Sequence, residues 1–153
     1  MRRAILWGGL IAAAFDFLFA SIAYGWARGR PVAGVWQSVA SGLLGKDAYD
    51  RGMATAALGV LCHVTIALIW ATIFVLASRR LPFLTRHAVP AGILYGIVIY
   101  LGMYLVVIPL SAFPHKITFS LRTVAPNLLA HMLLIGPSIA LAARRFLREP
   151  FPS

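Results

Sequence analysis

The chain has 153 residues, of which 61% are hydrophobic and only 12% are charged. A soluble domain is about 45–50% apolar and about 25% charged, so a water-soluble fold of this length could not bury so much apolar surface. A single cysteine excludes a disulfide scaffold, and the apolar composition excludes intrinsic disorder. The sequence therefore predicts an all-α integral membrane protein, in which lipid covers the apolar surface.

The charge is strongly basic, with 14 Lys and Arg residues against 4 Asp and Glu residues and a formal net charge of +10. The basic residues lie in short clusters between apolar runs, without the basic stripe and interleaved aromatic residues of a nucleic-acid surface. This distribution is typical of loops that contact anionic lipid headgroups. We therefore expect a lipid bilayer as the partner and no nucleic acid. A homo-oligomer or a complex with another membrane protein is also compatible with the sequence.

Four apolar runs are long enough to cross a bilayer, which takes about 20 helical residues. They cover residues 4–26, 53–78, 88–113 and 123–143. Each run is continuously apolar, which favours helices over a closed β-barrel with its alternating strands. We therefore predict one membrane domain over residues 1–153, built as a four-transmembrane-helix bundle. Pro109 and Pro137 lie inside the third and fourth runs, where neighbouring helices can accommodate them.

The segment 31–45, with the sequence PVAGVWQSVASGLLG, is too short to span a membrane. Its apolar residues recur at helical spacing and its polar residues fall elsewhere: Val32, Val35, Trp36, Val39 and Leu43 against Gln37, Ser38 and Ser41. The pattern predicts an amphipathic helix that lies in the outer membrane interface after the first span. A re-entrant segment that lines a cavity is the alternative.

The positions of Lys and Arg predict the orientation. With four spans, both termini share one side of the membrane with the loop between the second and third spans. That side holds eight basic residues: Arg2, Arg3, Arg79, Arg80, Arg86, Arg144, Arg145 and Arg148. The opposite side holds six: Arg28, Arg30, Lys46, Arg51, Lys116 and Arg122. This bias predicts a multi-pass protein of the bacterial inner membrane with both termini in the cytoplasm.

Small and polar residues gather on one face of each predicted span. The third span carries a GxxxG pattern at Gly92 and Gly96. The stripes on the other spans include Gly9, Ala13 and Asp16 on the first, Thr55, Gly59 and His63 on the second, and Asn127, His131 and Ser138 on the fourth. Because small residues let membrane helices approach closely, we predict these positions for helix packing: Gly9, Ala13, Gly59, Gly92 and Gly96.

Three ionisable residues fall at a similar depth in the membrane. Asp16 lies just past the middle of the first run, and His63 and His131 lie two or three residues before the middle of theirs. Since neighbouring spans are antiparallel and a helix rises 1.5 Å per residue, all three lie within about 5 Å of the midplane. The sequence therefore predicts one intramembrane polar centre with these members: Asp16, His63, His131, Tyr100, Tyr104, Asn127 and Ser138.

An ionisable residue inside a membrane is a candidate for proton relay or for binding a charged ligand. We therefore expect a proton-coupled transporter or a stress- or acid-tolerance membrane protein that needs no cofactor. Two alternatives stay open: a structural or assembly subunit whose polar cluster locks helices together, and a redox protein that binds haem or a metal through His63, His131 and Asp16. We expect no enzymatic activity, because the sequence has no nucleophile elbow, HExxH motif, P-loop or paired carboxylates.

The second half of the chain, from about residue 59 to 148, carries a set of scattered motifs. They are His63 in an apolar span, Pro82 in the inner turn, GILYG at 92–96, Met103 before Pro109 and Leu110, His131 in the last span, and RRFLR at 144–148. With these residues the chain resembles the YagU family of small bacterial inner-membrane proteins. The resemblance implies an inner-membrane location and a part in acid tolerance, with no agreed biochemical activity. The segment after the first span departs from the YagU pattern.

Overall fold

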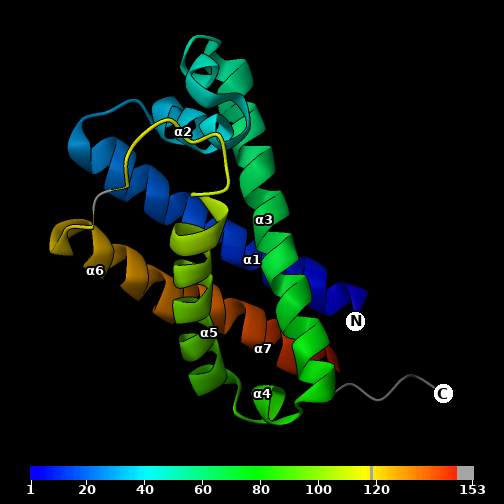
Figure 1. Cartoon of the computed structure of the whole chain (residues 1–153). Coiled ribbons are helices and arrows are strands. Elements are labelled where there is room, and N and C mark those ends of the chain that lie inside the picture. The colour runs from blue at the N-terminus through cyan, green and yellow to red at the C-terminus, as the bar shows by residue number, and fades with distance from the viewer. Residues whose placement is uncertain (118, 148–153) are drawn as a thin grey trace.

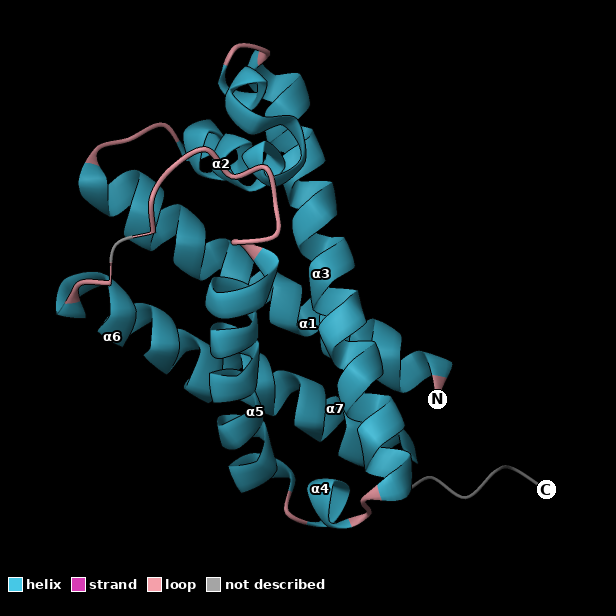
Figure 2. Ribbon diagram, in the orientation of Figure 1, coloured by secondary structure: helices cyan, strands magenta, loops and turns pink. Residues whose placement is uncertain are grey.

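The structure, a computed structural model, describes residues 1–117 and 119–147. The described part is helical and holds no β-strand (Figure 2). In chain order the main helices are α1 (Arg2–Ala20), α2 (Val32–Leu44), α3 (Gly52–Arg80), α4 (Phe83–Arg86), α5 (Ala88–Gly102), α6 (Leu121–Ala130) and α7 (Gly136–Leu147), as Figure 1 shows. Short turns extend or join them: η1 (Ser21–Gly25), η2 (Trp26–Arg28), η3 (Gly45–Tyr49), η4 (Met103–Val107) and η5 (His131–Ile135).

Four continuous helical stretches are long and apolar enough to cross a membrane, as predicted: Arg2–Arg28, Gly52–Arg80, Ala88–Val107 and Leu121–Leu147. Large apolar side chains are exposed along all four, among them Leu10, Leu18, Leu61, Ile69, Leu94, Val98, Leu129 and Leu133. A soluble protein of this size rarely exposes contiguous apolar surface over its whole length. The fold therefore fits a multi-pass membrane protein.

The third stretch ends earlier than predicted, at Val107 instead of residue 113. Pro109 has no N–H to donate, and its ring crowds the carbonyl four residues before it. The chain leaves the helix there, with the Leu110 and Ser111 N–H groups bonded to the Val106 and Ile108 carbonyls. The prediction that Pro109 lies inside the span is therefore wrong.

Prolines also explain two wider helical turns. The Ile108 N–H donates to the Met103 carbonyl five residues before it, at 2.9 Å, and the Gly136 N–H donates to the His131 carbonyl in the same way. These π turns, η4 and η5, each end two residues before a proline, Pro109 and Pro137. A π turn absorbs the crowding of a proline ring at the cost of regular packing, and such turns are frequent at functional sites.

Glycines allow the helices to approach closely at the end where α1 begins. On α1, Gly9 faces the backbone of Leu68 in α3, and Gly8 faces Ala142 in α7. On α5, Gly92 and Gly96 lie against Gly136 and the His131 carbonyl, where an added Cβ would overlap backbone atoms. Helix α1 therefore lies between α3 and α7, and α5 covers the other side of α7.

Helix α2 packs across the start of α3 instead of lying free. The Trp36 carbonyl lies directly on Gly59, and Trp36, Ala40 and Ser41 are buried. The Gln37 amide donates to the Gly52 carbonyl at 2.9 Å. The predicted helix over 31–45 is present, but the Gln37 and Ser41 side chains bond to the protein and the apolar Val32 and Leu43 are exposed.

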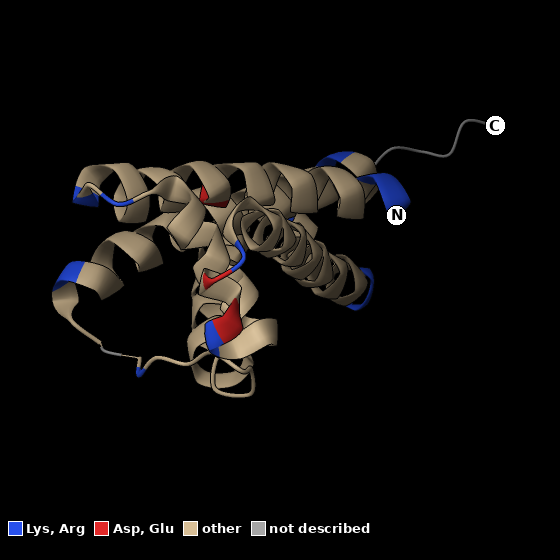
Figure 3. Ribbon diagram, turned by 90° about the horizontal axis from the view of Figure 1, so that it is seen from above, with Lys and Arg blue, Asp and Glu red and all other residues tan. Residues whose placement is uncertain are grey.

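The bundle has two unlike halves. In the closed half, a core of buried residues joins the start of α1, the end of α3, the start of α5 and α7, with Phe74, Val75, Ile139 and Ala143 at most 1% exposed. The open half lies at the other end, where α2 and the segment 108–117 cover the bundle (Figure 1). Lys and Arg residues, blue in Figure 3, occur at helix ends and in loops of both halves.

Candidate functional site

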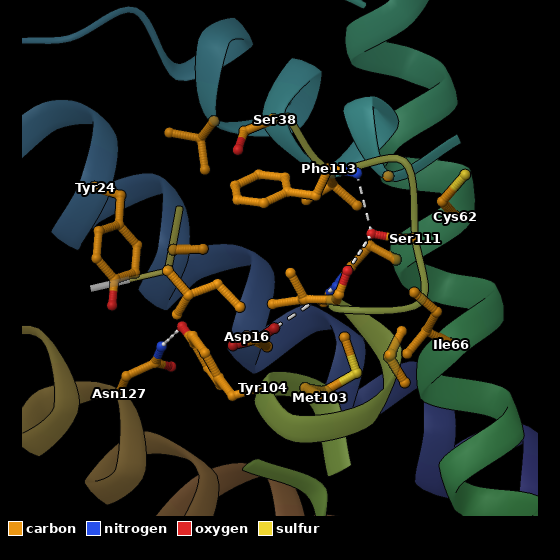
Figure 4. A pocket seen from close by; sticks show the side chains of 18 of the residues that line it. Asp16, Tyr24, Ser38, Cys62, Ile66, Met103, Tyr104, Ser111, Phe113 and Asn127 are labelled. Carbon is orange, nitrogen blue, oxygen red and sulfur yellow. Dashed lines mark hydrogen bonds and ion pairs between the residues drawn. The ribbon is translucent and has the colours of Figure 1, made fainter. Parts of the chain in front are cut away.

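A cavity of about 1140 Å³ occupies the open half, between α1, α2, α3, α5 and α6. Six of the seven predicted polar residues line it: Asp16, His63, Tyr100, Tyr104, Asn127 and His131. Figure 4 shows Asp16 between Tyr104 and Asn127 on one side and Cys62 and Ile66 on the other. Ser138 does not line the cavity, and its hydroxyl donates to the Leu134 carbonyl one turn earlier on the same helix.

Asp16 and His63 form a pair across α1 and α3. His63 Nδ1 lies 3.6 Å from Asp16 Oδ2, and both side chains are only partly exposed. His63 Nε2 lies 3.1 Å from the Ala13 carbonyl oxygen. A carbonyl only accepts hydrogen bonds, so Nε2 is the nitrogen that carries a hydrogen in the neutral ring.

This geometry has a consequence for the proton content of the pair. With the hydrogen on Nε2, neutral His63 directs the lone pair of Nδ1 at the Asp16 carboxyl group, and a bare carboxylate there would repel it. One proton between Nδ1 and Oδ2 removes the repulsion, whether it rests on the imidazole or on the carboxyl group. The pair is then neutral overall, which the low-dielectric surroundings favour.

Trp36 of α2 forms the wall behind this pair. Its ring stacks on Phe17 at a centroid distance of 4.5 Å and lies 5.1 Å from the His63 ring. Its indole N–H donates to the Ser21 hydroxyl at 3.2 Å. Trp36 is 3% exposed. The sequence pattern assigned it to a lipid-facing stripe, and nothing in the spacing indicated that it belongs to the site.

A second polar group lies on α5, η4, α6 and η5. His131 Nδ1 donates to the Asn127 carbonyl at 2.9 Å, and the Asn127 amide donates to the Tyr104 hydroxyl at 2.6 Å. The Tyr100 ring contacts both Tyr104 and His131, at 4.6 and 5.7 Å. In the described part of the chain no fully buried side-chain nitrogen or oxygen lacks a partner. Since the Tyr100 hydroxyl and His131 Nε2 bond to no described residue, they are open to the cavity.

The predicted single centre is thus two separate groups that line one cavity. His131 makes no hydrogen bond or ion pair with Asp16 or His63 in the described residues. Its Nδ1 is engaged by its own helix, and equal depth in the bundle does not place it on the same side of the cavity. Nor does any described group of three His, Cys, Asp or Glu residues come close enough to hold a metal ion.

Three basic residues near the ends of helices and in loops line the cavity. Arg28, Arg30 and Lys116 all line it, and the Arg28 guanidinium lies 5.0 Å from the centre of the Tyr24 ring. None of the three makes an ion pair with a described carboxylate, and Asp16 is the sole acidic residue among the described cavity-lining residues. The site therefore combines a basic mouth, apolar walls and the Asp16 and His63 pair deep inside.

Comparisons with known proteins give no relative from which a function could be transferred, since no family model, curated protein or solved structure matches the chain.

Proposed function

We propose that the chain is a multi-pass protein of the bacterial inner membrane that couples proton binding at Asp16 and His63 to movement of an amphipathic solute through the cavity. Its four helices supply the spans, and the basic count of the predicted inner loops supplies the orientation. The cavity is slightly larger than the usual range of small-molecule sites, which ends at about 1,000 Å³.

The observation that carries the proposal is the geometry of the pair. The Ala13 carbonyl fixes the hydrogen on His63 Nε2, which leaves Nδ1 facing Asp16 Oδ2 at 3.6 Å, and both residues line the cavity. An intramembrane carboxyl group that can gain or lose a proton next to a solute cavity is the arrangement a proton-coupled carrier needs. A role in acid tolerance, which the YagU resemblance implies, agrees with the same chemistry.

The test uses purified protein in lipid vesicles with a pH difference across the membrane. Two fluorescent amphipathic probes of opposite charge, anilinonaphthalene sulfonate and ethidium, are offered in separate experiments. We expect the pH difference to drive at least one probe across vesicles with the native chain at a rate well above empty vesicles. Asp16→Asn should reduce that rate to the empty-vesicle level, and Asp47→Asn, in the exposed turn η3, should not. Equal rates with and without Asp16, or no driven movement of either probe, contradict the proposal.

A structural role for the polar residues is the second candidate function. The His63 bond to the Ala13 carbonyl ties α3 to α1, and the Tyr95 hydroxyl donates to the Trp70 carbonyl at 2.7 Å, which ties α5 to α3. If the role is structural, Asp16→Asn lowers thermal stability, and the pH difference drives neither probe across the membrane. The haem alternative is weaker, because His63 Nε2 would have to leave the Ala13 carbonyl to bind iron.

A further inference from the structure

The charges of the cavity mouth point to one class of ligand. Three cations, Arg28, Arg30 and Lys116, line the cavity without an ion-pair partner among the described residues. An unpaired cation close to apolar walls interacts strongly with an anion that enters the same space. The Arg28 guanidinium is also held on the Tyr24 ring, so it is positioned and not free in the loop.

The depth of the cavity beyond the mouth is apolar. Arg28 follows Asp16 by 12 residues on a nearly continuous helix, which corresponds to about 18 Å along the axis. Large apolar and aromatic side chains also line the cavity, among them Ile66, Trp70, Ile99, Met103 and Ile135. A ligand that fills the cavity therefore needs a long apolar part as well as its charged end.

The deep polar pair does not favour the opposite charge. A lipophilic cation would need a carboxylate free to pair with it, but the Asp16 carboxyl group already faces His63 Nδ1 at 3.6 Å. It would also have to pass three positive side chains at the mouth. A ligand with an anionic head at the mouth and an apolar tail toward Trp70 is not repelled by the basic side chains and needs no carboxylate partner.

We infer that the cavity binds a single-chain amphiphile with an anionic head, of the fatty-acid class, with its carboxylate at Arg28 and Arg30 and with Lys116 adding to the positive potential of the lining. This ligand would be the solute of the proposed function. The inference rests on that function, because the function makes the cavity a ligand site. Binding itself does not require proton coupling, so the two ideas can fail separately.

The test measures quenching of tryptophan fluorescence by a brominated long-chain fatty acid added to the protein in phosphatidylcholine nanodiscs. Trp70 lines the cavity, and Trp36 lies behind it, so an occupied cavity brings bromine close to both rings. We expect saturable quenching that a non-brominated fatty acid reverses. The methyl ester and a long-chain trimethylammonium salt should compete at least ten times more weakly.

A triple variant tests whether the basic side chains bind the carboxylate. Arg28→Gln/Arg30→Gln/Lys116→Gln should weaken fatty-acid binding at least tenfold with an unchanged melting temperature. The matched control Arg79→Gln/Arg80→Gln/Arg86→Gln removes the same charge at the other end of the bundle and should keep native affinity. Equal competition by the methyl ester, tighter binding of the cation, or native affinity in the mouth variant overturns the inference.

The vesicle experiment shows whether the ligand class or the proton-coupled function is wrong. If fatty acid does not bind but pH drives ethidium across the membrane in an Asp16-dependent way, the ligand class is wrong and the proton-coupled function stands. If fatty acid binds through the mouth residues but neither probe moves with the pH difference, the ligand class stands and the coupled function is wrong.

Discussion

The closed and open halves of this bundle are built from the same four helices but with different residues at their contacts. In the closed half, glycine and alanine let backbones touch, as where Gly92 and Gly96 meet Gly136. In the open half, π turns and prolines interrupt the helices, and polar and aromatic side chains surround the cavity. Close packing leaves no room for a ligand, so one half fixes the fold and the other is available for function.

The helix η5–α7 joins the two halves. Gly136 belongs to the closed contact with α5, and His131, five residues earlier, faces the cavity. The π turn between them ends two residues before Pro137. A change in packing at Gly136 therefore reaches the cavity wall through one turn of helix.

The largest effect on stability is expected at this junction. A Cβ in Gly136→Ala would overlap the Gly92 carbonyl oxygen, and neither backbone can move without separating α5 from α7. We expect a loss of about 3 kcal/mol in unfolding free energy, measured by reversible unfolding in mixed micelles. The matched change Gly34→Ala on α2 meets open space and should be neutral or slightly stabilising. Similar losses in both variants would break the distinction between the halves.

A smaller effect is expected from a hydroxyl in the closed half. Tyr95→Phe removes the hydrogen bond to the Trp70 carbonyl but keeps the ring against Phe74, at a centroid distance of 4.8 Å. Loss of this bond should cost about 1 kcal/mol in the same unfolding measurement. Tyr49→Phe, in an exposed turn without a described hydroxyl partner, serves as the control and should leave the value unchanged.

The smallest effect is expected from the equivalent change in the open half. Tyr104→Phe removes the acceptor of the Asn127 amide, but that amide faces a cavity and can bond to water instead. The unfolding free energy should fall by about 0.5 kcal/mol or less. A loss larger than that of Tyr95→Phe would mean that the polar group at Tyr104 and Asn127 is a structural lock and not part of a ligand site.

Sequence reasoning located the spans and the Asp16 and His63 pair, because hydrophobic length and helical spacing report which residues lie inside and on which face. It could not place His131, since rotation of one helix about its axis against another depends on contacts such as Gly96 with the His131 carbonyl. It also missed Trp36 in the site, because an apolar stripe looks the same whether it meets lipid or another helix. The cavity itself arises from loops and π turns that leave no periodic signal.

The proton shared by Asp16 and His63 is the central claim, and nitrogen NMR of the His63 ring in ¹⁵N-histidine-labelled protein tests it most directly. The signal is assigned by its loss in His63→Gln, and the exposed His87 provides a reference. At neutral pH the native chain should show a hydrogen on Nε2 and a protonated or strongly hydrogen-bonded Nδ1, and Asp16→Asn should give a neutral ring whose Nδ1 lacks this strong bond. Identical His63 spectra in the native chain and in Asp16→Asn would contradict the account.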